Sequence, residues 1–186
     1  MRNYTRRTVA ILAFLTMMSP AVAQGPSAEQ ILRPRDPSAA TILESDRLLR
    51  FVLRLPVQRE LAFDAWTDAN QLVEWLSHWA EMTVAEGEGF RIGWEGYDGV
   101  WEGRYLEIDR PAKLVFTWLP PKSVFPGGAY ETLVTVLFRE TEDGATLLTL
   151  EHSGFRAAPE MEAQLQAWRP YLFALRAFLL QPPVSR

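Results

Sequence analysis

Apolar side chains occupy every second position from Leu49 to Leu55, which predicts a strand with one buried face. Pro56 ends this strand. From Gln58 onward the apolar positions change to helical spacing, with Leu61, Ala62, Ala65 and Trp66 on one face. The folded part of the chain is therefore predicted to begin as a strand followed by a helix.

A second short helix is predicted directly after the first. Asp68 stands three residues before Gln71, which is the arrangement of a capping box at a helix start. Its buried stripe would be formed by Leu72, Val73, Trp75 and Leu76.

Antiparallel strands and one long helix are predicted for the rest of the chain. The alternating runs are separated by Gly- and Pro-containing turns and cover 81–85, 90–94, 100–108, 113–118, 132–140 and 145–153. Trp168, Leu172, Leu175 and Leu179 then share one face of a long helix. Pro170 lies inside this helix or near its start, so we expect a kink or a break there.

This order of elements predicts an α+β domain in which the last helix covers one face of an antiparallel sheet. A curved sheet around a single helix leaves a space between the two. That space is either filled by side chains or open to a ligand.

The first residues have the layout of a signal peptide. Three arginines and no acid precede an apolar stretch at 8–18, and Ala21-Val22-Ala23 follows it. We therefore predict a signal peptide at 1–23, cut after Ala23, and a protein that is periplasmic or secreted. The apolar stretch is short for a transmembrane anchor, which needs roughly 20 residues. Thr5-Arg6-Arg7 leaves general secretion and twin-arginine export both open.

The remaining boundaries follow from composition. Residues 24–47 are rich in Pro, Ser, Ala and charge and are predicted to be a linker or loosely ordered arm. The folded domain is predicted at 48–181, and 182–186 is a tail.

The net charge of the chain argues against nucleic acid and membranes as partners. The formal charge of −4 becomes −7 once the three arginines of the leader are removed. Because such an acidic chain has no basic stripe, we expect neither nucleic-acid binding nor stable insertion into a membrane. Composition says nothing of the oligomeric state.

Residue counts also restrict the chemistry. The chain has no cysteine and only two histidines, His78 and His152. A disulfide framework and a cysteine nucleophile are excluded, and a multi-histidine metal centre is disfavoured. We expect no cofactor and no metal.

Several segments, in collinear order, resemble one known family. They are Ala65-Trp66-Thr67-Asp68 with Leu72 and Trp75, then 103–111, 114–118, 131–136 and 144–155, and finally the helix at Trp168. Over roughly 48–180 the chain resembles the family of activator-of-heat-shock-chaperone-ATPase homologues (AHSA type), a branch of the START-like SRPBCC superfamily. It departs from that pattern at Ala69, where proline is usual, and in its leader and arm.

The resemblance implies a helix-grip fold of the START and Bet v-like kind: an antiparallel sheet wrapped around the C-terminal helix, often enclosing an apolar cavity. It does not imply one activity, because its members include ligand-binding proteins, cyclase-like enzymes and chaperone co-factors.

His152 is the only candidate for a catalytic group. By period two it shares a strand face with Thr146, Leu148 and Leu150, and that face is predicted to look toward the helix. A histidine at a cavity can act as an acid–base group, in a cyclase- or hydratase-like enzyme. The alternative, which we favour, is a structural histidine that holds the turn at Ser153-Gly154-Phe155.

Large aromatic residues with a few polar atoms are typical of apolar ligand sites. The predicted ligand-binding residues lie in or beside the strands and on the last helix: Trp94, Trp101, Tyr105, Trp118, Tyr130, Leu148, His152 and Leu172. Any one of the aromatics can instead belong to the core or the rim. Glu102, Glu107 and Glu131 could place a carboxylate in the cavity, but surface ion pairs with Arg104 or Arg139 are favoured.

The function predicted from these features is the binding of a small apolar or amphipathic ligand between the sheet and the last helix, without catalysis. The alternatives are the enzyme that uses His152, and a chaperone co-factor or protein-interaction module.

Overall fold

The computed structural model describes residues 41–45, 47–125 and 128–181, with side chains described from Arg47 onward. The predicted signal peptide at 1–23, the first part of the predicted arm and the predicted tail at 182–186 lie outside the described residues.

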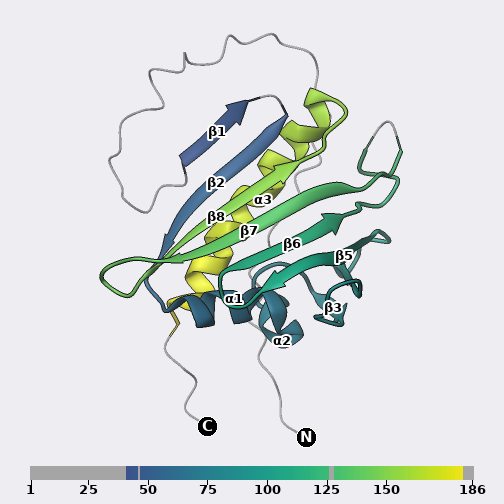
Figure 1. The fold of residues 1–186 in the computed structure, drawn as a ribbon. Helices are drawn as coiled ribbons and strands as arrows, with labels where there is room; N and C mark the ends of the chain where they lie inside the picture. Colours follow the sequence, from purple (N-terminus) through teal and green to yellow (C-terminus); the bar gives the residue numbers. More distant parts are fainter. Residues whose placement is uncertain (1–40, 46, 126–127, 182–186) are drawn as a thin grey trace, which may run out of the picture. The chain divides into compact units, whose positions relative to one another are not determined.

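The domain is built on one antiparallel sheet of eight strands in the order β1-β2-β8-β7-β6-β5-β4-β3 (Figure 1). The strands are β1 Thr41–Ser45, β2 Leu48–Leu55, β3 Trp79–Met82, β4 Gly89–Gly93, β5 Val100–Asp109, β6 Lys113–Trp118, β7 Thr132–Glu140 and β8 Thr146–Ser153. β6 and β7 have the predicted bounds, and β8 begins one residue later than predicted. The α+β prediction is confirmed.

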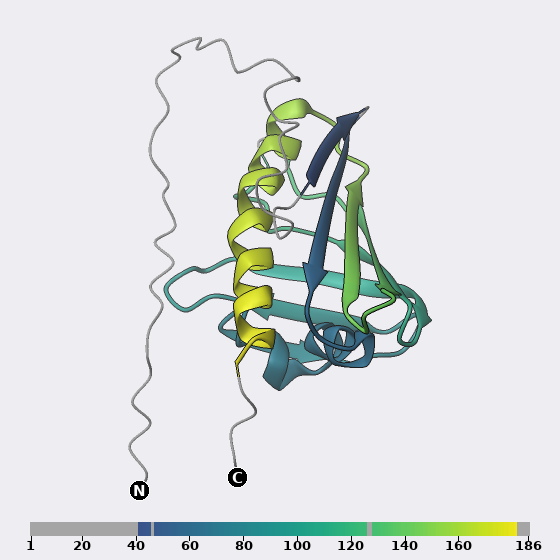
Figure 2. The same cartoon turned by 90° about the vertical axis from the view of Figure 1, so that its left-hand side faces the viewer.

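A long helix, α3 (Ala158–Leu179), runs along one face of this sheet (Figure 2). Its buried side includes Leu165, Trp168, Leu172 and Leu175, spaced as in an amphipathic helix. These residues belong to one hydrophobic core with the inward side chains of the sheet. The predicted helix-grip arrangement is therefore confirmed.

Two short helices, α1 (Arg59–Thr67) and α2 (Ala69–Leu72), follow β2 as predicted. The side chain of Asp68 caps α2, because its Oδ1 accepts hydrogen bonds from the backbone N–H of Asn70 at 2.8 Å and of Gln71 at 3.3 Å. Trp75 then fixes the next turn against α1 by donating its indole N–H to the Ala65 carbonyl at 2.8 Å.

β1 is an addition to the sequence-based prediction. It lies inside the range assigned to the linker or loosely ordered arm, and it pairs with β2 from Thr41↔Val52 to Ser45↔Leu48. This pairing satisfies backbone groups of β2 that would otherwise form an exposed sheet edge. Whether residues 41–45 form a strand therefore depends on their pairing with β2 and not on the composition of the segment.

The predicted break at Pro170 is wrong, because α3 continues through this residue. Proline cannot donate to the carbonyl four residues earlier, which here belongs to Gln166. Both residues lie on the exposed face of α3, where water can satisfy the released carbonyl. Packing of the opposite face keeps the helix continuous.

The strand expected at 81–85 begins and ends earlier, at Trp79 and Met82. From Thr83 the backbone enters a turn in which Gly87 has a positive φ of 85°, a conformation that glycine adopts without steric cost.

None of the described helices is long and apolar enough to cross a membrane.

Candidate functional site

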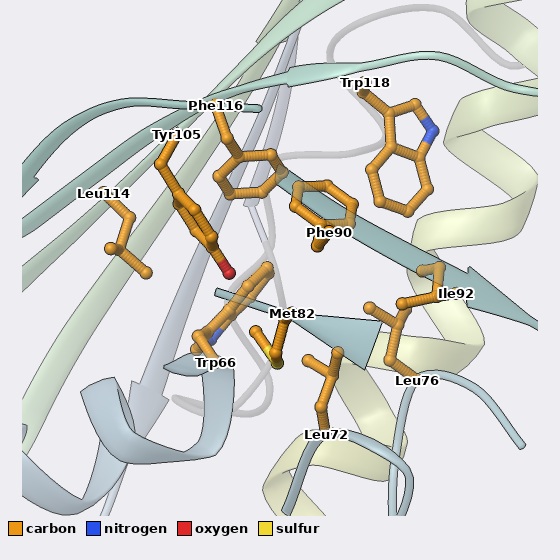
Figure 3. A pocket seen from close by; sticks show the side chains of 10 residues that line it. All are labelled: Trp66, Leu72, Leu76, Met82, Phe90, Ile92, Tyr105, Leu114, Phe116 and Trp118. Atoms are coloured by element: carbon orange, nitrogen blue, oxygen red, sulfur yellow. The ribbon is translucent and has the colours of Figure 1, made fainter. Parts of the chain in front are cut away.

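A small cavity lies between the sheet and the two short helices (Figure 3). Its volume is about 20 Å³. Strands β4, β5 and β6 line one side, and α1, α2, the turn after α2 and the edge strand β3 supply the other. The lining residues are Trp66, Leu72, Leu76, Met82, Phe90, Ile92, Tyr105, Leu114, Phe116 and Trp118.

Strand periodicity explains the sheet side of this cavity. Phe90 and Ile92 of β4 point inward, as do Leu114, Phe116 and Trp118 of β6. The rings contact one another, with Phe90 and Phe116 edge to face at 5.5 Å between centroids.

The other side is fixed by the angle between α1 and α2. Trp66, near the end of α1, packs edge to face on Trp75 with 4.7 Å between ring centroids. The Asp68 cap starts a new helix directly after α1, which brings Leu72 and Leu76 to the cavity. Met82, at the end of β3, completes this side.

Three polar atoms at this apolar site lack a partner among the described residues. The indole N–H groups of Trp66 and Trp118 are buried and make no hydrogen bond. The hydroxyl of Tyr105, a residue that is only 2% exposed, makes none either, and Figure 3 shows its oxygen pointing into the cavity. Burial raises the pKa of Tyr105 above its ordinary value, so the phenol stays protonated and can donate.

The cavity as it stands is too small for an organic ligand. A volume of roughly 10–15 Å³ suffices for one water molecule, and a cavity that takes benzene is about 150 Å³. The space therefore has room for about one water unless a wall moves.

Its position also differs from the sequence-based prediction, which put a cavity between the sheet and the C-terminal helix. No residue of α3 lines this cavity. The interface with α3 is filled by Trp168, whose ring centroid lies 5.4 Å from that of Trp118 and 6.1 Å from that of Trp66. Large aromatic side chains from both layers therefore pack together at this part of the interface.

Of the predicted ligand-binding residues, the structure brings Tyr105 and Trp118 together at the cavity. The other six lie elsewhere: Trp94, Trp101, Tyr130, Leu148, His152 and Leu172. Leu148 and Leu172 are core residues, 0% and 3% exposed.

His152 is completely buried and both of its ring nitrogens are engaged. Trp168 donates its indole N–H to Nδ1 at 3.0 Å, so this nitrogen carries no proton. Nε2 then carries the proton and lies 2.7 Å from Oγ1 of Thr132, which in turn donates to the Trp118 carbonyl at 2.9 Å. Burial lowers the pKa of His152 to about 3. The ring is therefore neutral at ordinary pH, and neither nitrogen is left for a substrate.

Tyr130 anchors the loop after β6 to the start of α3. Its hydroxyl donates to the carboxylate of Glu160 and accepts from the backbone N–H of Arg156 at 2.9 Å. The Arg156 guanidinium lies 4.0 Å from the centre of the ring. Burial, followed by the hydrogen bond to Glu160, raises the pKa of Tyr130. These contacts hold the loop after β6 against the start of α3.

Trp94 and Trp101 belong to a second aromatic cluster, half-buried near the turn between β4 and β5. Their rings meet edge to face at 4.6 Å, and Tyr171 of α3 lies 5.8 Å from Trp94. Tyr97, 42% exposed, packs on Trp101 at 5.5 Å.

The three glutamates considered for the cavity all form ion pairs outside it. Glu102 pairs with Arg91 at 3.2 Å, Glu107 with Lys113 at 2.7 Å, and Glu131 with Arg104 at 3.9 Å. Within the described ranges, no group of three or more histidine or acidic side chains is arranged to hold a metal ion.

Sequence reasoning missed eight lining residues, including Phe90, Phe116 and Met82. Strand alternation places Phe90 and Phe116 on the inner face. It does not say which inner-face residues meet the short helices, because that depends on how the chain turns after α1.

Comparison with known proteins supports a family. The profile of the family described as "Activator of Hsp90 ATPase homolog 1-like protein" matches residues 56–179. No curated protein sequence matches the chain.

Solved structures share the fold. Protein MLL2253 from Mesorhizobium loti has a TM-score of 0.64 and 22% identity, with 72% of this chain and 96% of that one covered. PFC0360w, an HSP90 activator from Plasmodium falciparum, has a TM-score of 0.62 and 24% identity over 74% of this chain and 99% of that one. CalU16 from Micromonospora echinospora has a TM-score of 0.59 and 22% identity over 72% and 76%.

Proposed function

The chain belongs to the family of Activator of Hsp90 ATPase homolog 1-like proteins, and we propose that it binds a small apolar or amphipathic molecule that carries a hydrogen-bond acceptor. The observation that carries this proposal is the apolar cavity into which the unpaired hydroxyl of Tyr105 points.

A hydrogen-bond donor that lies unpaired in an apolar cavity destabilises the folded protein. A buried donor without a partner destabilises a folded protein by about 1–3 kcal/mol. The indole N–H of Trp66 is such a donor, and the hydroxyl of Tyr105, a residue only 2% exposed, also has no hydrogen-bond partner among the described residues. A carbonyl, ether or hydroxyl oxygen of a ligand would accept from them, while its apolar part replaces contacts among the surrounding rings.

A ligand needs more than the 20 Å³ present, and the side formed by α2 and β3 is the one suited to move. α2 has four residues, and β3 is an edge strand that pairs with β4 alone. Short elements with few backbone partners open at low free-energy cost. Outward displacement of Leu72, Leu76 and Met82 would enlarge the cavity without disturbing the central strands.

Two probes of similar shape test this proposal. Acetophenone has a carbonyl acceptor and ethylbenzene does not. We expect acetophenone to bind more tightly, and Tyr105→Phe to reduce that advantage by about two- to tenfold, the value of one hydrogen bond of 0.5–1.5 kcal/mol. Binding is measured by nuclear magnetic resonance titration of the folded protein.

The matched control is Tyr97→Phe. This tyrosine lies outside the cavity and its hydroxyl contacts Ser123 Oγ at 2.9 Å. It should leave the affinity for both probes unchanged. Absence of binding by either probe, or equal effects of the two variants, would contradict the proposal.

A chaperone co-factor is the second candidate, favoured by the family description and by the likeness to the Plasmodium falciparum activator. The exposed Leu133 and Leu137 on the outer face of β7 offer apolar contacts for a protein partner. Stimulation of the ATPase of a purified Hsp90, reduced by Leu133→Ser with Leu137→Ser, would support this role. No stimulation at saturating protein would exclude it.

We further propose that the protein acts outside the cytoplasm after removal of 1–23. The basic start, apolar core and Ala21-Val22-Ala23 of the leader support this. The mass of the mature protein from fractionated cells should correspond to a chain beginning at Gln24. Because the chaperone and its ATP are intracellular, this proposal and the co-factor role exclude each other. Full-length protein in the cytoplasmic fraction would overturn export and favour the co-factor.

A further inference from the structure

Met82 lines the same small cavity as Tyr105 and Trp66, and among the lining residues it alone carries a sulfur atom (Figure 3). It ends β3, the edge strand that pairs with β4 alone in the described sheet, and the residue is half-buried. Its side chain has three rotatable bonds and adapts to irregular spaces. A small solute at this edge of the sheet can therefore meet the sulfur.

The cavity has hydrogen-bond donors but lacks a strong acceptor. The hydroxyl of Tyr105 and the indole N–H of Trp66 are both without a partner among the described residues. Apart from the phenol oxygen itself, the lining side chains contain no oxygen, and the thioether sulfur of Met82 accepts only weakly. The site therefore lacks an acceptor atom that faces Tyr105.

The volume of the cavity suits one additional atom. The space is about 20 Å³, and a single water oxygen needs roughly 10–15 Å³. One oxygen atom attached to a lining side chain would therefore fit without displacement of a wall, whereas an organic ligand requires one.

Oxidation of methionine by a peroxide supplies such an oxygen. A lone pair of the sulfur attacks one oxygen of hydrogen peroxide, so that an S–O bond forms and the O–O bond breaks. The other oxygen leaves with both hydrogens as water. The sulfur loses two electrons and the peroxide gains them. The product is a polar sulfoxide, which disrupts a core when it is buried without a partner.

We infer that Met82 is a site of oxidation to the sulfoxide, and that the sulfoxide oxygen enters the cavity and accepts the hydrogen bond of Tyr105. Pairing with this donor offsets the cost of burying a polar oxygen. The inference goes beyond the proposed function, since the acceptor belongs to the chain itself and no external ligand is needed.

Peroxide treatment of the folded full-length protein, followed by peptide mass spectrometry, tests the site of oxidation. Met161 provides the comparison within the chain, because it is only 5% exposed and lies in α3. We expect Met82 to be oxidised at least about tenfold faster, since access to the sulfur limits the reaction. If Met82 is oxidised no faster than Met161, the inference is wrong.

Thermal unfolding before and after oxidation tests the hydrogen bond. Oxidation should lower the Tm by about 2–4 °C more in Tyr105→Phe than in the unmodified protein, the value of one hydrogen bond. Tyr97→Phe is the matched control, because its hydroxyl contacts Ser123 outside the cavity, and its shift should equal that of the unmodified protein. Met82→Leu keeps the volume of the side chain but removes the sulfur, and should abolish the shift.

A measurement on the unmodified protein replaces this test if Tyr105→Phe does not fold. A hydroxyl proton that gains a hydrogen bond exchanges more slowly with water, so that of Tyr105 should become visible by nuclear magnetic resonance after oxidation. Methionine sulfoxide reductases of both stereospecificities, with dithiothreitol, should reverse the change. Equal Tm shifts with and without the Tyr105 hydroxyl, or a hydroxyl proton unaffected by oxidation, would overturn the inference. Because no acetophenone is present in these experiments, their failure leaves the proposed function standing.

Discussion

Trp168 of α3 donates its indole N–H to Nδ1 of His152 in β8, with 3.0 Å between the two nitrogens. This bond assigns the tautomer of His152, because the other nitrogen must then carry the proton toward Thr132. The helix and the sheet are thus joined at their centre by a polar chain that ends on the Trp118 carbonyl, beside the cavity.

The first prediction concerns the pH dependence of stability. The pKa of His152 is about 3 in the folded protein, whereas a histidine in the unfolded chain titrates near 6.5. Between these values the unfolded state binds one more proton. His152 should therefore lower the free energy of unfolding by about 1.4 kcal/mol for each pH unit below roughly 6, and have no such effect above pH 7.

Denaturation by urea at pH 4.5, 5.5 and 7.5 measures this effect. His152→Gln should be less stable at pH 7.5 but show a shallower decline toward acid than the unmodified protein. Thr149→Val, at a half-buried position of the same strand, removes no titratable group and provides the control, which should keep the original slope. Parallel pH profiles for the protein and His152→Gln would contradict the assignment.

The second prediction concerns Thr132, which accepts from His152 and donates to Trp118. Thr132→Val keeps the shape of the side chain but leaves both partners buried and unpaired. We expect a loss of about 1–3 kcal/mol in the free energy of unfolding. Thr149→Val, at a half-buried position on the outer face of β8, should change it by less than about 0.5 kcal/mol. Equal effects in urea denaturation would show that the polar chain does not stabilise the fold.

The third prediction concerns Gly103 of β5. A Cβ at this position would lie 2.2 Å from the Thr117 carbonyl oxygen and 2.3 Å from the Phe90 ring. Gly103→Ala should therefore shift the backbone or Phe90 and cost about 1–3 kcal/mol. At Gly93 the nearest atoms, at 2.6 Å, belong to the end of the half-buried Trp79 side chain, which can rotate away. Gly93→Ala should be the milder change in thermal unfolding, and the reverse order would refute this account.

The fourth prediction concerns the kinetics of ligand exchange past Met82. Met82→Ala shortens a half-buried side chain that lines the cavity at the edge strand, so acetophenone should associate and dissociate faster with little change in affinity. Val84→Ala, just beyond the end of β3, is the control and should leave both rates unchanged. Line-shape analysis in nuclear magnetic resonance gives the rates, and unchanged exchange in Met82→Ala would place the entry route elsewhere.

Local pattern was sufficient for most of the secondary structure. The alternation in 113–118 and 132–140 predicts β6 and β7 with the bounds that the structure shows. The spacing of Asp68 and Gln71 likewise predicts the start of α2. These features depend on residues a few positions apart, and such interactions are encoded directly in the order of side chains.

The local sequence pattern was not sufficient where the structure of a segment depends on residues far away in the chain. β1 forms because β2 offers it an edge, and α3 continues through Pro170 because its other face is packed. Tyr105 and Trp118, predicted to bind a ligand between the sheet and the last helix, line a cavity at the short helices. Trp94 and Trp101, predicted for the same ligand site, meet each other at the half-buried cluster. Sequence spacing does not specify which inward side chains face one another.

The sequence by itself determined the kind of fold, the resemblance to the family and the scarcity of titratable groups that can do chemistry. The tertiary structure decided that Trp168 packs against Trp118 and Trp66 between α3 and the sheet. It also decided that both ring nitrogens of His152 make internal hydrogen bonds, and that the cavity lined by Tyr105 lies at α2 and β3. The physical reason is close packing: the volume left between two layers depends on how all their side chains fit together, and no local segment contains that information.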